Sequence, residues 1–72
     1  MPIFVLNSKR LRNGEHEVHS LAETCPHLPR IENQIDLGRH PTCNEALELA
    51  RRLWPNYRIN GCPHCAKDCH ID

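Results

Sequence analysis

The sequence has few of the residues that build a large hydrophobic core. It holds one Phe, one Trp and one Tyr among 72 residues, and apolar residues make up 39% of the chain. A chain of this length buries only about 60% of the surface that it exposes when unfolded. Domains of this size commonly depend on disulfides, a metal ion or a partner for their stability. We therefore predict one domain, residues 1–72, that is stabilised by more than its core.

The chain also lacks long apolar segments and an excess of either charge. The apolar run at residues 3–6 is too short for a signal peptide, and basic residues follow it instead of preceding it. No segment approaches the length that spans a bilayer. Nine basic and nine acidic residues give zero net charge, whereas a dedicated nucleic-acid-binding domain usually has a basic excess. Two local basic clusters, which we interpret as solvated surface, are Lys9, Arg10 and Arg12, and Arg51, Arg52 and Arg58.

Five cysteines and six histidines are abundant against this background. The odd number of cysteines argues against a fully paired disulfide framework, so we expect reduced thiols in a cytoplasmic protein. Cys62 and Cys65 are separated by two residues, and the intervening turn brings both sulfurs to the same side of the chain. Such a pair can bind one metal ion. Because zinc takes four ligands, this pair is half of a zinc site.

The remaining pattern predicts an α+β fold. Residues 3–6 and 15–21 are expected to be strands joined by a hairpin turn at Asn13-Gly14. A further strand over residues 31–37 would place Ile31, Ile35 and Leu37 on one face, before a turn at residues 38–41. A short strand at residues 57–59 would precede a turn at Asn60-Gly61. We expect an N-terminal β-hairpin or short antiparallel sheet packed on one main helix, with a zinc knuckle at the C-terminal end.

The main helix is predicted from residue 43 to about residue 54. Thr42 and Glu45 have the spacing of a capping box, and Pro55 ends the helix. Cys43, at the first helical position, is expected to be a small buried apolar residue. The predicted core stripe consists of Ala46, Leu49, Ala50 and Leu53, widened by Leu47 and Trp54.

The two missing zinc ligands have several candidates. His19 at the end of a strand and Cys25 in the following loop could join Cys62 and Cys65, which would close a long loop and restrict the unfolded chain strongly. Structural zinc contributes about 10–16 kcal/mol in small peptides, enough to decide folding. A local site with Cys69 and His70 ranks second, and a mixed site with Cys69 in place of His19 is a further alternative. His16, His27 and His40 are predicted to be surface residues.

Several short motifs in the same order resemble those of a known family. They are Asn7-Ser8-Lys9, Val18-His19, Cys25-Pro26, Asn33, Asn44-Glu45-Ala46 and the pair Cys62 and Cys65. Together they are similar to the amino-terminal zinc domain of the Ada DNA-repair protein and to related short bacterial modules. The resemblance implies a zinc-stabilised fold in which Cys25, Cys62 and Cys65 are ligands.

The family pattern differs from this chain at one ligand. The family has a Cys where this chain has His19, and that Cys accepts a methyl group from DNA. A zinc-bound imidazole has its lone pair committed to the metal and is no substitute for a thiolate nucleophile. The resemblance therefore implies the zinc fold without the repair activity.

We accordingly predict a non-catalytic structural zinc module that presents a surface to a protein or nucleic-acid partner, with no membrane association and no evident small-molecule substrate. A four-coordinate site leaves no position for catalytic water. The first alternative is a dithiol oxidoreductase that uses Cys62-Pro63-His64-Cys65, although only seven residues follow the pair. Two further alternatives are a methyl acceptor at Cys25, Cys62 or Cys69, and an iron–sulfur cluster on Cys25, Cys62, Cys65 and Cys69.

Overall fold

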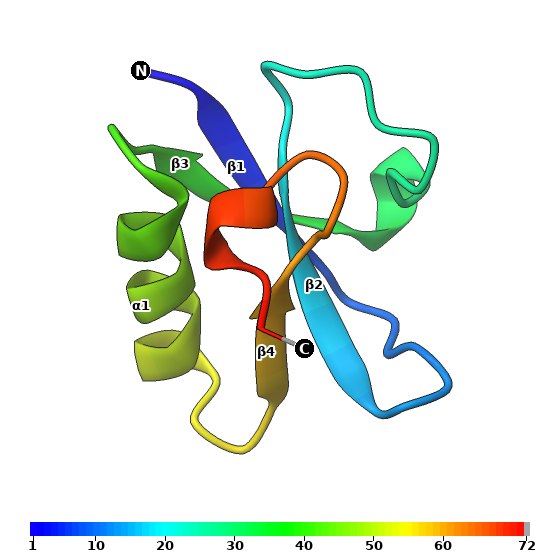
Figure 1. Ribbon diagram of the computed structural model, residues 1–72. Helices are drawn as coiled ribbons and strands as arrows, with labels where there is room; N and C mark the ends of the chain where they lie inside the picture. Colours follow the sequence, from blue (N-terminus) through cyan, green and yellow to red (C-terminus); the bar gives the residue numbers. More distant parts are fainter. Residues whose placement is uncertain (72) are drawn as a thin grey trace.

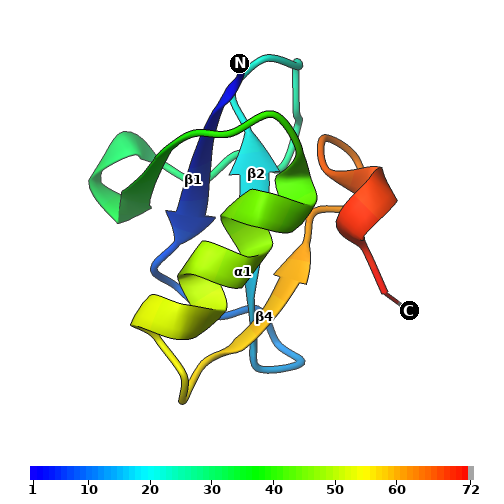
Figure 2. The same ribbon diagram turned by 90° about the vertical axis from the view of Figure 1, so that its left-hand side faces the viewer.

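The computed structural model, which describes residues 1–71, confirms the α+β fold as one helix on a four-stranded sheet (Figure 1). The strands are β1 (Ile3–Asn7), β2 (Glu15–Ser20), β3 (Gln34–Arg39) and β4 (Arg58–Gly61), in the order β3-β1-β2-β4. β1 is antiparallel to both β2 and β3. β4 runs parallel to β2, so the sheet is mixed. The helix α1 (Cys43–Leu53) lies diagonally across one face of the sheet (Figure 2).

The β1–β2 connection is a hairpin with a three-residue turn. The Leu11 N–H donates to the Glu15 carbonyl at 2.8 Å, and the Gly14 N–H donates to the Leu11 carbonyl at 2.9 Å. Gly14 has φ 86°, a conformation that costs glycine little because it has no Cβ. Asn13 does not adopt positive φ, so the expected two-residue Asn13-Gly14 turn is replaced by a three-residue turn that ends in glycine.

The helix begins where the capping pattern predicts. The Thr42 hydroxyl accepts the Glu45 N–H at 3.4 Å, and the helix ends at Leu53 with Trp54 as its C-cap. The buried stripe, however, differs from the predicted one, since Leu53 is 55% exposed. Cys43 and Trp54 pack at the rim of a core formed by Ala46, Leu47 and Ala50 of α1 with Phe4, Leu6, Val18, Leu37, Ile59 and Cys69. Within residues 1–71, no helix is both long and apolar enough to cross a membrane.

The segment before α1 is more irregular than expected. Ile31 belongs to a 3₁₀ helix, η1 (Ile31–Asn33), and is 82% exposed, so the strand that was expected from residue 31 begins only at Gln34. The predicted turn at residues 38–41 also comes too early, because β3 continues to Arg39. A bulge opposite Phe4 and Val5 lets it continue, and Gly38 takes φ 82° there.

Gly61 is the last residue of β4 and is not part of the turn that was predicted at Asn60-Gly61. A Cβ at this position would lie 2.8 Å from both the Ala66 carbonyl oxygen and the Cys69 Cβ. The glycine therefore allows the C-terminal 3₁₀ helix η2 (Lys67–Cys69) to pack closely on β4.

A disulfide joins Cys43 at the start of α1 to Cys69 in η2, with 6.2 Å between the two Cα atoms. The expectation of uniformly reduced thiols is therefore wrong for these two residues, and Cys43 is not simply a buried apolar residue. The odd number of cysteines concealed this pair, because Cys25, Cys62 and Cys65 stay free. The disulfide ties the helix to the C-terminal segment directly beside the core.

Candidate metal centre

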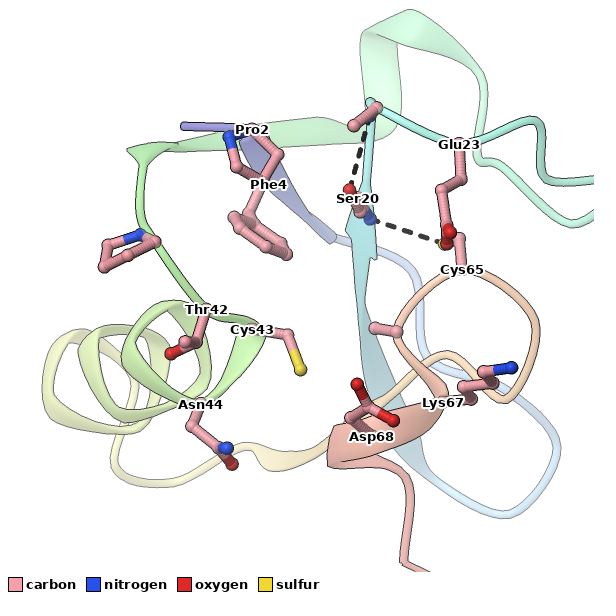
Figure 3. Close-up of a pocket in the computed structure, with 13 residues that line it drawn as sticks. Pro2, Phe4, Ser20, Glu23, Thr42, Cys43, Asn44, Cys65, Lys67 and Asp68 are labelled. Carbon is pink, nitrogen blue, oxygen red and sulfur yellow. Dashed lines mark hydrogen bonds between the residues drawn. The ribbon is translucent and has the colours of Figure 1, made fainter.

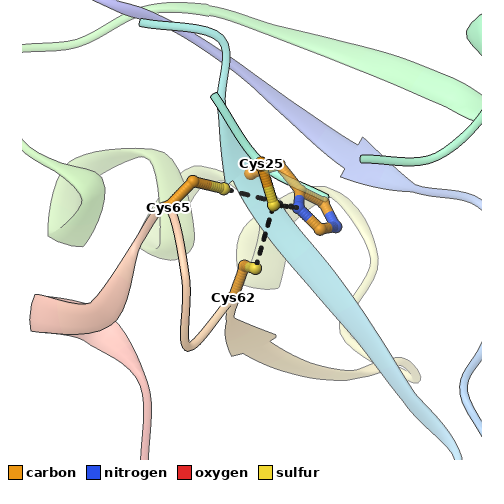
Figure 4. Close-up of side chains that lie close together, drawn as sticks. Cys25, Cys62 and Cys65 are labelled. Carbon is orange, nitrogen blue, oxygen red and sulfur yellow. Dashed lines mark hydrogen bonds between the residues drawn. The ribbon is translucent and has the colours of Figure 1, made fainter. Parts of the chain in front are cut away.

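Four side chains converge at one end of the β2–β4 pair. Their donor atoms, from His19, Cys25, Cys62 and Cys65, all lie within 4.8 Å of one another. Because β2 and β4 are parallel, their C-terminal ends meet at the same edge, and the Cys62 N–H donates to the Val18 carbonyl at 2.9 Å. Figure 4 shows Cys25, from the loop after β2, facing Cys62 and Cys65 from the turn after β4.

Three of the six distances between these donor atoms are close to those expected around one tetrahedral ion. The Cys25 and Cys62 sulfurs are 3.6 Å apart, and His19 Nδ1 lies 3.8 Å from Cys25 Sγ and 3.5 Å from Cys65 Sγ. Zinc bonded to sulfur and nitrogen at its usual lengths places two sulfurs about 3.8 Å apart and sulfur and nitrogen about 3.6 Å apart. The three distances fall within about 0.3 Å of those values. The group therefore has the size and shape to hold a metal ion.

Neighbouring groups orient these donors. The Ser20 N–H donates to Cys65 Sγ at 3.3 Å, and the His64 N–H donates to Cys62 Sγ at 3.4 Å. Backbone N–H donors of this kind favour the thiolate form. Cys25 is half-buried, whereas Cys62 is fully buried and Cys65 is 5% exposed. Two of the three sulfurs are therefore both enclosed and hydrogen-bonded.

His19 is the fourth donor and is completely buried. Its Nδ1 faces the sulfurs, while its Nε2 has no hydrogen-bond partner within the described structure and lies 3.6 Å from Glu17 Oε1. A metal at Nδ1 requires the ring proton to be on Nε2, on the side of the carboxylate. A carboxylate behind a ligating histidine is the usual outer arrangement of such sites. Glu17 was not identified from sequence, although its position two residues before His19 on the same strand face was the available signal.

The protonation of the isolated group favours neutral side chains. Burial raises the pKa of the Cys62 and Cys65 thiols, and burial, with a smaller effect from His27, lowers the pKa of His19 to about 4. Burial also raises the pKa of Glu17, against the opposing charge of His27. A metal ion reverses the effect on the thiols, because a coordinated thiol is deprotonated outright. Burial therefore opposes the thiolate form of these sulfurs, and a bound cation would favour it.

The predicted alternative ligands lie elsewhere. Cys69 is bonded to Cys43, which excludes it as a substitute for His19 and as the fourth ligand of an iron–sulfur cluster. His70 Nδ1 lies 2.9 Å from the Gly61 carbonyl oxygen. The second-ranked local site, built from Cys69 and His70, is therefore wrong. The structure instead brings together the four side chains that ranked first.

Two of the three histidines that were predicted to be surface residues are buried or half-buried. His16 is 8% exposed, stacks on Tyr57 and has its Nδ1 3.0 Å from the Asn7 carbonyl oxygen. His40 is half-buried, with Nε2 2.6 Å from the Leu37 carbonyl oxygen. His27 is exposed, as expected. The polar neighbours of His16 in the sequence gave no sign of its burial. The ring that covers it, Tyr57, is distant in the sequence.

A cleft of about 370 Å³ opens beside the cysteine group, between the end of β2, the start of α1 and η2 (Figure 3). Pro2 and Phe4 form an apolar part of its wall, and Cys65 borders it. Its charged lining residues are Glu23, Lys67 and Asp68. Since these carry charges of both signs, the cleft has no clear preference for an anion or a cation.

Comparisons with protein-family models, with curated protein sequences and with solved structures yield no significant match to this chain. The resemblance to the Ada zinc domain stays a prediction.

Proposed function

We propose that this chain is a structural zinc-binding module that binds the phosphate backbone of single-stranded nucleic acid. In this proposal His19, Cys25, Cys62 and Cys65 hold the ion, and the opposite end of the β2–β4 pair provides the binding surface. The observation that supports the metal most directly is the convergence of one imidazole and three sulfurs within 4.8 Å.

The donor set favours zinc in a structural role. Thiolates and imidazole suit zinc, and three sulfurs with one nitrogen are among its usual structural ligand sets. Four protein ligands leave no open position for water or substrate, so the ion would stabilise the fold and would not act as a catalyst. The ion would connect the loop after β2 to the turn after β4, across a sequence separation of 37 residues between Cys25 and Cys62.

The basic end of the molecule supports a polyanionic partner. The cluster at residues 9–12 lies in the β1–β2 connection, and Arg58 follows the α1–β4 loop; both connections lie at the lower end of Figures 1 and 2. Arg58 Nη1 donates to the Asn13 carbonyl at 2.8 Å, which joins the two segments. Arg51 Nη2 donates to the Ile59 carbonyl at 3.4 Å, so α1 adds its own basic residues nearby. The fold thus gathers two separate basic clusters at one end of a chain with no net charge.

Aromatic rings accompany these cations. Tyr57 is 37% exposed, with its ring parallel to that of His16 at 3.9 Å between centroids and nearly parallel to that of Trp54 at 6.2 Å. Cationic side chains beside aromatic rings are typical of surfaces that bind single-stranded nucleic acid, where the cations contact phosphates and the rings stack on bases. This combination favours a nucleic acid over a protein as the partner.

The redox and methyl-transfer alternatives have less support. An oxidoreductase needs an acidic first thiol, commonly at a helix N-terminus, whereas burial raises the pKa of Cys62 and Cys65. Methyl transfer of the Ada type would need a thiolate at position 19, where this chain has an imidazole.

Metal analysis and chelation test the first half of the proposal. We expect one zinc per chain in the purified protein and loss of the helical circular-dichroism signal when a strong chelator removes it. Single Cys62→Ser and Cys65→Ser variants should lose zinc, whereas Cys43→Ser should retain it. A well-folded sample with far less than one equivalent of zinc would refute this half.

A salt series tests the second half. A fluorescent single-stranded oligonucleotide should bind at low salt, with an affinity that falls steeply as salt rises. Arg12→Ala and Arg52→Ala remove exposed cations of the basic end. Each should reduce the slope of the logarithm of the binding constant against the logarithm of the salt concentration by about one. Arg30→Ala, on the exposed loop after Cys25, is the matched control and should leave the slope unchanged. Failure of the oligonucleotide to bind at low salt would refute nucleic-acid binding at the basic end. A reduction of the slope by Arg30→Ala equal to that by Arg12→Ala or Arg52→Ala would refute it too.

A further inference from the structure

We propose that His27 and His64 form a second site for a divalent transition-metal ion, on the surface and separate from the His19–cysteine group. Each histidine ends the same tripeptide, as Cys25-Pro26-His27 and Cys62-Pro63-His64. The two cysteine sulfurs lie 3.6 Å apart. Proline fixes the backbone φ directly after each cysteine, so the two turns begin alike, and the rings of His27 and His64 lie next to each other.

The two imidazoles meet at the surface. Their ring centroids are 4.4 Å apart, with 35° between the ring planes, and both residues are exposed. Both line one cavity of about 320 Å³, together with Leu11, Leu28 and Pro63. Neutral imidazole nitrogen is a good ligand for zinc, nickel and copper, so an exposed adjacent pair offers two ligands to an ion from solution.

Glu17 lies near this pair of imidazoles. Its side chain lines the same cavity and is 8% exposed, and one carboxylate oxygen lies 3.6 Å from His19 Nε2 on the other side. Two imidazoles are a donor pair that binds first-row divalent metals and leaves the other coordination positions open to solvent. Glu17 would then stand between the two metal sites, behind His19 in one and beside the imidazoles in the other.

Ring stacking alone is the competing explanation for the proximity of His27 and His64. Aromatic rings prefer offset or tilted arrangements at such centroid distances without any ion. The two explanations differ in whether the pair has a saturable affinity for a metal. A metal site requires both imidazoles, whereas stacking confers no affinity.

Calorimetric titration of the protein as isolated with Ni²⁺ tests the proposal. We expect one saturable, exchangeable Ni²⁺ per chain, with paramagnetic broadening of the His27 and His64 ring signals in the proton NMR spectrum. His27→Asn and His64→Asn should each weaken this binding by about tenfold or more while the zinc content and helical signal stay unchanged. His40→Asn removes an imidazole elsewhere and should bind Ni²⁺ as the parent does.

Two results would overturn the outer site: no saturable Ni²⁺ binding by the parent, or equal binding by the parent and the His64→Asn variant. Absorbance from nickel–thiolate bonds reports any entry of Ni²⁺ into the inner cysteine group. The outcome is separate from that of the zinc proposal. If the isolated protein contains no zinc but its Ni²⁺ binding is still lost in the His64→Asn variant, the zinc proposal is refuted and the outer site is supported.

Discussion

If the domain binds zinc as proposed, removing the metal should unfold it, whereas removing the Cys43–Cys69 disulfide should only weaken it. The disulfide closes a loop with a sequence separation of 26 residues. For a loop of this length, the restriction of the unfolded chain amounts to about 3.5 kcal/mol at 25 °C. In a domain of this size, each kcal/mol shifts the melting temperature by about 4–8 °C, so we expect a loss of about 14–28 °C. Structural zinc at about 10–16 kcal/mol equals or exceeds the whole stability of a typical domain, about 5–15 kcal/mol.

The assay is thermal unfolding followed by circular dichroism at one pH and one protein concentration. The Cys43→Ala/Cys69→Ala double variant should keep its zinc and its helical signal. Its melting temperature should be about 14–28 °C lower than that of the parent. The parent with its disulfide intact should lose the helical signal when a chelator removes the ion. A chelated parent that melts as high as the zinc-bound parent, or a double variant that is unfolded with zinc present, would refute the assignment of the ion as the main stabilising cross-link.

Three further predictions follow from single positions. Gly61→Ala places a Cβ 2.8 Å from the Ala66 carbonyl oxygen and should destabilise the domain by about 1–3 kcal/mol in urea unfolding; an unchanged midpoint would contradict the close packing of η2 on β4. Cys25, half-buried, should be alkylated by iodoacetamide before Cys62 or Cys65, and peptide mass spectrometry that finds either of the others modified first would contradict the burial order. Burial lowers the pKa of His19 from 6.5 to about 4, so the unfolded chain binds the extra proton between these values. The contribution of His19 to the free energy of unfolding should therefore be lost as the pH drops from about 6.5 to 4. Loss of the metal on acidification acts in the same direction, and urea unfolding that shows higher stability at pH 5 than at pH 7 would contradict both.

The features that the sequence predicted well depend on neighbours along the chain. The helix start at Thr42 and its end before Pro55 are local patterns, and the structure has both close to where they were expected. The convergence of His19 and Cys25 with the Cys62–Cys65 pair was also predicted, because few other donors have spacings that fit one ion. Spacing sufficed here since the metal-ligand geometry itself restricts the choices.

The features that were missed depend on contacts between distant segments. Asn60-Gly61 has the composition of a turn. In the structure, however, the missing side chain of Gly61 lets Cys69 pack against β4, and the sequence alone does not show this contact. The pairing of Cys43 with Cys69 was hidden because three other thiols made the count odd. The parallel alignment of β4 with β2 is also invisible locally, although it is what gathers the two basic clusters at one end.

The spacing of the four donors has a consequence for the order of events during synthesis. His19 and Cys65 are 46 positions apart, and Cys62 and Cys65 lie close behind one another. A ribosome adds about 5–20 residues each second, so the first two donors wait for seconds before the last two emerge from the exit tunnel. During that interval the nascent chain holds Cys25 as an unprotected thiol. In the zinc proposal, the complete set of four donors is available to the ion only after Cys65 has been translated.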